Sequence, residues 1–332
     1  MHVLGGEGLQ AEGLLEAWLF DGKGGGTPVT DGEMLNAPPP QTGFLWLHFR
    51  ALPRRRQDWL REQSRIDPLI IDSMLDDESR PHCAMHADGA YLVLRAVNLH
   101  RNALPEELQG VHFWVEERRI VTLQHEPVSA IADFIDALRR GRCPRTQGEM
   151  VADLAMRLVE RLDSVVAALM DQADELEDEV AGGQASDIMP RQAILRRVSI
   201  KLRRHIAPQR EALTHFSLED DPWIGPKDRN RLRDAADRVT RFTEELDSIR
   251  ERASLIRDQL VDRRAEQMNQ SMLVLAVVTV VFAPLTFVSG LFGMNVGGIP
   301  GEENPESFWI ISFLLIAFAL GLAWVFRRMK LF

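Results

Sequence analysis

Hydrophobic residues gather near the C-terminal end of the chain in two runs that contain no charged residue. The first run, 272–292, is 21 residues long, and the second, 308–326, is 19 residues long. At ~1.5 Å of rise per residue, each run makes a helix of about 30 Å, which matches the hydrocarbon thickness of a lipid bilayer. A short segment, 293–307, joins them. This pattern predicts two membrane-spanning helices connected by a small loop.

Charged residues around the two runs predict how this hairpin is oriented. The loop is acidic and has no Lys or Arg, whereas the far flanks of both runs are basic. The basic flanks hold Arg263, Arg264, Arg327, Arg328 and Lys330, and the loop holds Glu302, Glu303 and Glu306. By the positive-inside rule, we expect both termini in the cytoplasm and the loop outside. The three glutamates are expected to attract cations there.

The first 145 residues alternate short β-like runs with helix-like runs, and turn residues such as Asp88-Gly89 separate them. Strands are expected at Leu14–Phe20, Gly43–Phe49, Tyr91–Val97, Val111–Val115 and Ile120–Leu123. Helices are expected at Arg54–Arg65, Pro68–Asp77 and Val128–Arg139. We therefore predict an N-terminal cytoplasmic α/β domain with a mixed sheet over residues 1–145.

Strand signals stop after residue 149, and long helices follow. Two helices are expected at Val151–Val180 and Ile188–Phe216. A third helix begins near Lys227 and meets no Gly or Pro before Pro284. We assign residues 146–271 to a helical stalk that continues directly into the first span.

Two regular series of positions run along the third helix. One is apolar, with alternating gaps of three and four residues over four heptads, which is typical of coiled-coil-like packing. It consists of Leu232, Ala235, Val239, Phe242, Leu246, Ile249, Ala253, Ile256 and Leu260. The other series lies about 200° around the helix and holds mainly small or polar residues. It consists of Asp258, Asp262, Ala265, Asn269, Met272, Ala276, Thr279, Ala283, Thr286 and Gly290.

Two interpretations of this small and polar stripe are open. It can pack closely against another helix, with threonine hydroxyls bonded to their own backbone, or it can line a water-filled pore formed by several copies. The oxygen-bearing side chains of Asp258, Asp262 and Asn269 favour a pore for a hydrated hard cation. Because neither span contains Asp, Glu, His, Lys, Arg or Cys, an ion crossing there is expected to keep most of its water.

Composition and motifs exclude several classes of function. The formal net charge of -10 argues against nucleic-acid binding. The chain has no P-loop and no hydrolase motif, so we expect neither ATP-driven transport nor an enzyme. Cys83 and Cys143 make no disulfide framework, which indicates a reducing compartment, and the N-terminus has no signal-peptide pattern.

Two further clusters are candidates for metal chemistry. His82, Cys83 and His86 bring three ligand groups into five residues, which is a candidate regulatory zinc site. An acidic cluster on the first long helix is either a solvated face or a cation-attracting surface. It consists of Asp171, Asp174, Glu175, Glu177, Asp178 and Glu179. We expect no bound cofactor.

The outer end of the first span resembles a known family. A Gly-Met-Asn motif at 293–295 follows that span, a long stalk helix precedes it, and a basic tail, 327–332, closes the chain. This combination resembles the CorA family of divalent metal ion transporters. The segments 296–301 and 80–98 are similar to the zinc-transporter (ZntB) branch of that family.

The resemblance implies a funnel-shaped homopentamer in the bacterial inner membrane, with the first spans around the pore and the second spans, 308–326, outside. Gly293, Met294 and Asn295 would form the outer filter, where a ring of asparagine oxygens grips the hydration shell of a cation. Pore-lining residues carried over by spacing are Asp258, Asn269, Met272, Ala276, Thr279, Ala283, Thr286 and Gly290.

The resemblance also implies Zn²⁺ as the transported ion, with Mg²⁺ or Co²⁺ as the alternative within the family. The expected partners are further copies of the chain, divalent cations and membrane lipids. A membrane-anchored signalling or scaffold protein is the competing hypothesis from another class. The direction of transport and its coupling to protons are open.

Overall fold

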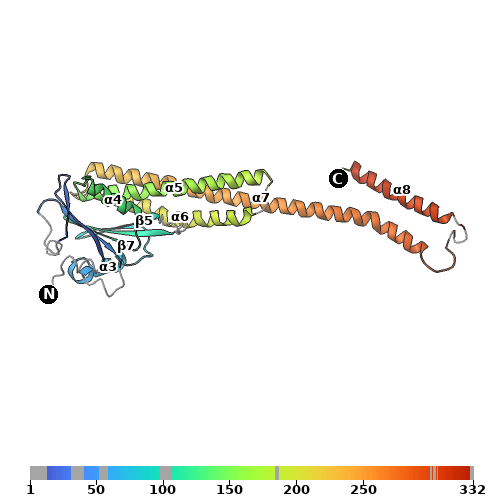
Figure 1. Cartoon of the computed structure of the whole chain (residues 1–332), viewed down its shortest axis with the longest axis horizontal. Coiled ribbons are helices and arrows are strands. Elements are labelled where there is room, and N and C mark those ends of the chain that lie inside the picture. Colours follow the sequence, from blue (N-terminus) through green and yellow to red (C-terminus); the bar gives the residue numbers. More distant parts are fainter. Residues whose placement is uncertain are drawn as a thin grey trace. The chain divides into compact units, whose positions relative to one another are not determined.

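The computed structural model describes residues 13–30, 41–51, 59–97, 107–183, 187–299, 301, 304 and 306–329. They fall into two compact units, Met1–Arg257 and Asp258–Phe332, which are described separately below. In Figure 1 the first unit runs from blue to yellow-orange and contains a sheet and several helices. The second contains the C-terminal apolar helices.

The described residues of the first unit hold one seven-stranded mixed sheet in the order β2-β1-β3-β7-β6-β5-β4. The strands are β1 (Leu14–Phe20), β2 (Gly26–Pro28), β3 (Phe44–Arg50), β4 (His82–His86), β5 (Gly89–Val97), β6 (Leu108–Val115) and β7 (Arg119–Gln124). The central pair β3 and β7 is parallel, and the other neighbouring pairs are antiparallel. The expected mixed sheet is therefore confirmed.

Both faces of the sheet are covered, which explains why its strands read as nearly continuous apolar runs. On one face, β3, β5, β6 and β7 pack against the π-helical turn η2 (Trp59–Gln63) and the helix α3 (Pro68–Met74). On the other face, Trp46 of β3 meets Phe134 of α4 (Ser129–Arg139) edge-on, with ring centroids 5.4 Å apart.

Two segments of this domain differ from the elements expected from the sequence. The segment 82–86, which lies outside the expected strands, is the edge strand β4, paired with β5 from His82 to His86. Helix Arg54–Arg65 is only partly described: 52–58 lie outside the described residues, and 59–63 form a π-helical turn. β-Branched and aromatic residues do not mark β4, so its pairing with β5 decides its structure.

Three long helices complete the first unit: α5 (Gln147–Ala181), α6 (Ile188–Leu218) and the first part of α7 (Pro226–Phe292). Thr146 caps α5, because its hydroxyl accepts a hydrogen bond from the Glu149 backbone N–H at 3.0 Å. The chain leaves α5 at Gly182 and at Gly183, whose φ of 78° is in the left-handed region.

The apolar seam predicted on the third helix is confirmed as the core of this three-helix packing. Its nine residues, from Leu232 to Leu260, are all buried, with at most 3% of each side chain exposed. Because α5 and α6 supply apolar partners such as Leu169 and Leu202, a single chain buries the whole seam.

Ion pairs fix how α7 lies along α5. The pairs Arg231–Asp153, Arg241–Asp163 and Arg252–Asp174 each join residues that are 78 positions apart. A constant offset means that the two helices run parallel and that the pairs hold one register, as charged flanks do in coiled coils.

The second unit consists of the rest of α7 and α8 (Ser307–Arg328). Both helices are long and apolar enough to cross a membrane, judged by length and composition, and their most apolar windows are 0% buried inside the chain. α7 continues through Pro284 without a break and ends at Phe292. The described residues therefore match the two predicted spans.

Candidate functional site

The small and polar stripe lies on α7 and is exposed along its length in the single chain. Asn269, Met272, Thr279 and Thr286 are all exposed, and so is Gly290 at the end of the stripe. Because the stripe follows a seven-residue repeat, it winds left-handedly around a straight helix. In a left-handed bundle of several copies, this face of each helix would therefore point towards the bundle axis along its whole length.

Thr279 shows what a hydroxyl on the stripe does within one chain. Its Oγ1 donates a hydrogen bond to the Leu275 carbonyl at 2.8 Å, as the close-packing interpretation expects. The same oxygen keeps lone pairs that can accept a hydrogen bond from water. The bond to the backbone therefore fits both interpretations of the stripe.

Pro284 adds a second oxygen near Thr279. Proline has no N–H, so the Val280 carbonyl, one turn earlier, has no helical donor. The helix nevertheless continues past this point. This leaves a backbone oxygen beside the stripe that can bind water.

The Gly-Met-Asn motif lies where α7 ends. The Gly293 N–H closes the last turn by donating to the Ser289 carbonyl at 2.9 Å. Met294 and Asn295 follow outside the helix, with exposed side chains. A Cβ on Gly293 would lie 3.2 Å from the Ser289 carbonyl oxygen, which is a tight contact. Glycine is thus favoured here by close approach of the backbone, since the φ of Gly293 is not in the left-handed region.

Part of the acidic loop can be placed. Glu306 is exposed, and its N–H donates to the Asn304 side-chain oxygen at 3.0 Å just before α8. Glu302 and Glu303 lie outside the described residues, as does Lys330 of the basic tail.

The stripe identified in the sequence begins at Asp258, but the same alternating spacing of three and four residues continues from there towards the N-terminal end of α7. This extension lies opposite the buried seam and is exposed in the first unit. It consists of Leu255, Glu251, Ser248, Glu244, Arg241, Asp237 and Asp234. Four of the seven residues are acidic, so this face of the cytoplasmic part of α7 can attract cations. The spacing alone was a sufficient signal to find it.

The acidic cluster on α5 is largely used within the chain. Arg252 of α7 bonds to Glu177 at 2.7 and 2.8 Å, and also contacts Asp174. Arg191 of α6 contacts Glu179 at 2.7 Å and Glu175 at 3.1 Å. These carboxylates hold the helices together, which disfavours the interpretation of the whole cluster as a free cation-attracting surface.

The candidate zinc ligands His82, Cys83 and His86 are not placed to share one metal ion in this structure. They are on strand β4, where successive side chains point to opposite faces, so Cys83 faces away from both histidines. Burial, with a smaller contribution from Glu219, raises the pKa of the Cys83 thiol to about 12, so the metal-binding thiolate is disfavoured. Within the described ranges, no three His, Cys, Asp or Glu side chains are placed to hold a metal ion.

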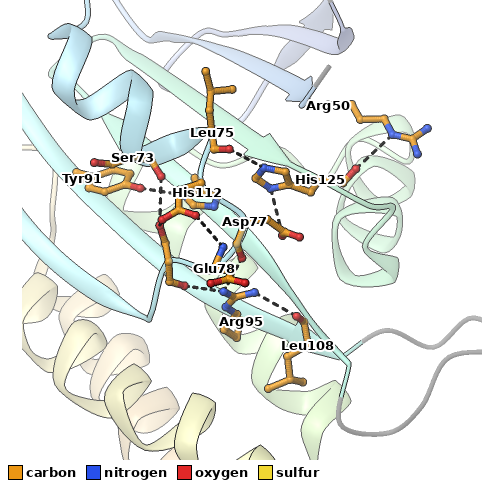
Figure 2. A network of polar contacts seen from close by, with 12 residues as sticks. Arg50, Ser73, Leu75, Asp77, Glu78, Tyr91, Arg95, Leu108, His112 and His125 are labelled. Carbon is orange, nitrogen blue, oxygen red and sulfur yellow. Dashed lines mark hydrogen bonds and ion pairs between the residues drawn. The ribbon is translucent and has the colours of Figure 1, made fainter. Parts of the chain in front are cut away.

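A polar network joins the segment after α3 to the sheet (Figure 2). The Arg95 guanidinium on β5 donates to the carbonyls of Asp77 and Ser79, both at 2.7 Å, and to the Leu108 carbonyl at 3.1 Å. His125 contacts the Leu75 carbonyl through Nε2 at 3.2 Å. These contacts satisfy the carbonyls of Leu75, Asp77 and Ser79, which lie outside the strands, and they tie that segment to β5 and β7, so the network is structural.

Two buried histidines are kept neutral. His112 shares a 2.9 Å hydrogen bond with the Tyr91 hydroxyl, and His48 shares one of 2.8 Å with Thr122. Burial lowers the pKa of His112 to about 3, helped by the nearby His125 and Arg95, and burial lowers the pKa of His48 to about 4.

The family is shown by comparison with known proteins. The family model described as "CorA-like Mg2+ transporter protein" matches residues 41–328, which is most of the chain. The chain is similar to the divalent cation transporter CmaX of Pseudomonas aeruginosa, with 35% identity over 96% of both chains. It is also similar to the zinc transport protein ZntB of Pectobacterium carotovorum, with 30% identity over 99% of both chains.

Solved structures agree in fold. The full-length CmaX structure has 34% identity and a TM-score of 0.81, covering 96% of this chain and 98% of that one. The CorA magnesium transporter from Methanocaldococcus jannaschii has the same TM-score, 0.81, at 18% identity, over 95% of this chain and 98% of that one, and it supports the fold alone. Family, fold and the two apolar helices agree, and an enzyme is excluded by the family. The chain therefore belongs to the CorA-like family and is a divalent cation transporter.

Proposed function

We propose that several copies of this chain, five by resemblance to the family, surround a water-filled passage with the stripe on α7 and transport Zn²⁺ through it. The observation that carries the proposal is the stripe itself. Apart from Met272, its residues are small or oxygen-bearing at every third or fourth position, whereas a lipid-facing helix surface would be apolar.

The chemistry of the stripe favours an ion that keeps its water. Thr279 and Thr286 present neutral oxygens, and within the spans no carboxylate, imidazole or thiolate is available to strip a cation of its shell. Asn295 at the outer end of α7 supplies an amide oxygen that can accept hydrogen bonds from a hydrated ion. Asp258 and Asp262 supply charge at the other end of the stripe.

Zinc as the cargo is supported by two similarities. The relatives named zinc transport protein ZntB match 99% of this chain at 30% identity. The residues after the Gly-Met-Asn motif, 296–301, are also similar to that branch. The pore oxygens by themselves suit Mg²⁺ as well. A flux assay in which the two metal ions compete must therefore decide which ion is transported.

The charge pattern supports an orientation, and the similarity to bacterial transporters supports a location. Arg263 and Arg264 precede the first span, and Arg327 and Arg328 end the second. We assign both termini to the cytoplasm of a bacterium, the spans to its inner membrane, and the Gly-Met-Asn loop with Glu306 to the outer side. A proton relay within the spans is not part of the proposal, because no ionisable side chain is present there.

The test is zinc flux into proteoliposomes that contain a zinc-sensitive dye. The purified full-length chain should carry Zn²⁺, and Asn295→Ala should slow the flux at least tenfold. Asn304→Ala is the matched control, because Asn304 is in the same loop but outside the motif, and its flux should stay close to wild type. Excess Mg²⁺ or Co²⁺ outside should leave most of the zinc flux intact.

Three outcomes would contradict parts of the proposal. Zinc flux no greater than in empty liposomes would show that the chain does not transport zinc. Equal flux in wild type and Asn295→Ala would show that Asn295 is not part of a filter. Repeating the assay with a pH gradient in each direction measures whether proton flow drives the uptake. Block by equimolar Mg²⁺ would instead assign the passage to magnesium.

A further inference from the structure

We infer that a cavity at one end of the sheet binds a small oxyanion of the phosphate type. The cavity has a volume of about 180 Å³ and lies in the first unit, where the turn after β1, the start of β3, the turn between β6 and β7 and the start of α5 come together. The proposed transport of zinc uses none of these segments. The inference therefore goes beyond the proposed function and can be tested separately.

The size and polarity of the cavity limit what it can hold. A volume of about 180 Å³ exceeds the space that a single water molecule needs, whereas pockets for drug-sized ligands reach about 300–1,000 Å³ and are mostly apolar. Phe44 is the one hydrophobic side chain of the lining, and it is almost fully buried. The cavity therefore suits a small polar molecule or ion.

Two arginines line the cavity from different segments. Arg118 belongs to the turn between β6 and β7, and its guanidinium donates to the Gln41 carbonyl, which fixes its position. Arg145 lies two residues before α5, and its side chain runs along the turn after β1, where a Cβ on Gly24 would lie 3.5 Å from the Arg145 Nε. Within the described residues, no carboxylate pairs with the Arg145 guanidinium, since Arg145 bonds to Glu149 through its backbone N–H.

The lining also contains one carboxylate, that of Glu117. Its Oε1 lies 3.8 Å from the Arg118 Nε, and its side chain is 73% exposed, so solvent and Arg118 both weaken its charge. Two guanidinium groups against one carboxylate leave an excess of positive charge. This excess disfavours a metal cation in the cavity and favours an anion.

The first turn of α5 supplies a further donor. Gln147 is the first residue of α5, lines the cavity and is buried. The backbone N–H groups of Gly148, Glu149 and Met150 all have acceptors, whereas that of Gln147 has none within the described residues. Because buried N–H groups rarely lack a partner, this group indicates that a bound ion or water completes the site. The helix dipole favours an anion there and adds to the effect of the two arginines.

The walls of the cavity are fixed before any ligand binds. Gly43 has a φ of 80°, and a Cβ there would lie 1.8 Å from the Phe20 carbonyl oxygen, so only glycine fits. The turn after β1 is held by Asp21, whose Oδ1 accepts hydrogen bonds from the N–H groups of Lys23 and Gly25 at 2.7 and 2.8 Å. A preformed site of this kind loses little free energy in ordering itself around a ligand.

The donors favour a tetrahedral oxyanion. An arginine fork matches two oxygens of a phosphate, sulfate or carboxylate group. Two forks and one backbone N–H that reach the cavity from three segments call for oxygens that point in different directions, which a tetrahedral anion has and a planar carboxylate lacks. The ligand is therefore free phosphate or the phosphate group of a small ester.

Equilibrium dialysis of the full-length chain in detergent, with radiolabelled inorganic phosphate, tests the site at constant ionic strength and without metal ions. Wild type should bind phosphate saturably, with a single site per chain. Arg145→Gln should weaken binding about tenfold or more, because it removes a charge-assisted contact. Arg142→Gln is the matched control, since Arg142 is an exposed arginine three residues earlier that does not line the cavity, and it should bind as wild type does.

Glu117→Gln distinguishes a ligand site from damage to the fold. Without this carboxylate the cavity is more positive, so phosphate should bind about threefold tighter or more. A variant that merely disturbed the turn between β6 and β7 would lose binding instead. Weaker or unchanged binding in Glu117→Gln would contradict the placement of the anion beside this side chain.

Competition identifies the class and the source of the anion. Unlabelled sulfate should displace the label, and chloride at the same concentration should not, whereas equal displacement by both would overturn an oxyanion site. Glycerol 3-phosphate that displaces the label more strongly than unlabelled phosphate does would identify a phosphate ester as the ligand. Weaker displacement would identify free phosphate, and both results support the site.

The remaining outcomes separate this inference from the proposed function. No saturable binding to wild type at millimolar phosphate would overturn the site, and so would equal losses in Arg145→Gln and Arg142→Gln, since general surface charge would then explain the binding. Either result would leave zinc transport standing. A wild-type chain that binds phosphate but carries no zinc into liposomes would instead contradict only the proposed function.

Discussion

Arg252 on α7 donates two hydrogen bonds to the carboxylate of Glu177 on α5, at 2.7 and 2.8 Å. The bidentate pair holds the pKa of the Glu177 carboxyl below its usual range and raises the pKa of Arg252. Among the ion pairs described above that fix the register of α7 along α5, this pair lies nearest to the membrane-spanning part of α7.

Replacing Arg252 by Met should weaken this register. Because the two side chains are 21% and 43% exposed, solvent screens the pair, and we expect a loss of about 1 kcal/mol in the free energy of unfolding. Denaturant unfolding of the full-length chain in detergent measures the loss. Arg250→Met is the control, since Arg250 contacts Asp247 on its own helix at 3.7 Å and does not join α7 to α5 through any ion pair among the described residues. A double-mutant cycle with Glu177→Gln that gives no coupling would contradict the assignment.

Phe242→Ala should destabilise the first unit much more. Phe242 is fully buried in the α7 seam, and removing a buried phenyl group costs about 3–5 kcal/mol through lost burial and the cavity left behind. Leu255→Ala, on the exposed side of the same helix, should cost less than about 1 kcal/mol. Unfolding followed by circular dichroism distinguishes the two. Equal effects would mean that the seam is not the core of the bundle.

Gln209 has a specific task between α6 and the sheet. Its side-chain oxygen accepts the Arg95 backbone N–H at 2.7 Å, beyond the point where β4 stops pairing with β5. Gln209→Met should leave that buried N–H without a partner and cost about 1–3 kcal/mol. Arg210→Met, one residue further and exposed, should be close to neutral. Faster amide exchange at Arg95 in the Gln209 variant is the direct measurement.

The buried histidine His112 predicts a dependence of stability on pH. Its pKa is lowered from the usual 6.5 to about 3, so the unfolded chain binds more protons between these values, and stability falls as pH drops below about 6.5. At pH 5 the loss from His112 alone should be on the order of 2 kcal/mol. His112→Gln should flatten the profile of melting temperature against pH between 5 and 7. A profile as steep as wild type would place the titration elsewhere, with His48 next to be replaced.

Thr286→Val tests the stripe without changing side-chain volume. Losing one hydroxyl from each copy should slow zinc flux about fivefold or more, since each lost hydrogen bond to water is worth about 1 kcal/mol. Phe287→Leu, one position away from the stripe, is the control and should transport normally. If the two variants behave alike, the face around Thr286 does not line the passage.

The features with strong periodicity were predictable from the sequence. The nine-residue seam of α7, the two apolar runs and the long strands β5 to β7 all appear where their patterns place them. In each case one hydrophobic pattern extends over many residues, so the type of element and its apolar positions can be identified from the sequence. The candidate zinc ligands at 82–86 do not converge, because the segment is a strand and adjacent side chains of a strand take opposite faces.

Interactions between distant segments were not predictable in the same way. Nothing local shows that Arg252 reaches Glu177, or that Gln209 covers the Arg95 N–H, since these partners are set by how helices pack. The acidic cluster on α5 therefore looked like a surface for cations, although part of it bonds to α6 and α7.

The constant separation of 78 residues between bonded partners on α5 and α7 has a consequence for biosynthesis. A ribosome adding about 5–20 residues per second needs roughly 4 to 16 s after making Asp153, Asp163 or Asp174 to make the arginine that pairs with it. During that interval the apolar side of α5 is covered by α4, by the sheet and by α6 as it emerges. The first transmembrane segment follows on the same helix, so membrane insertion begins soon after the nascent bundle receives its last helix.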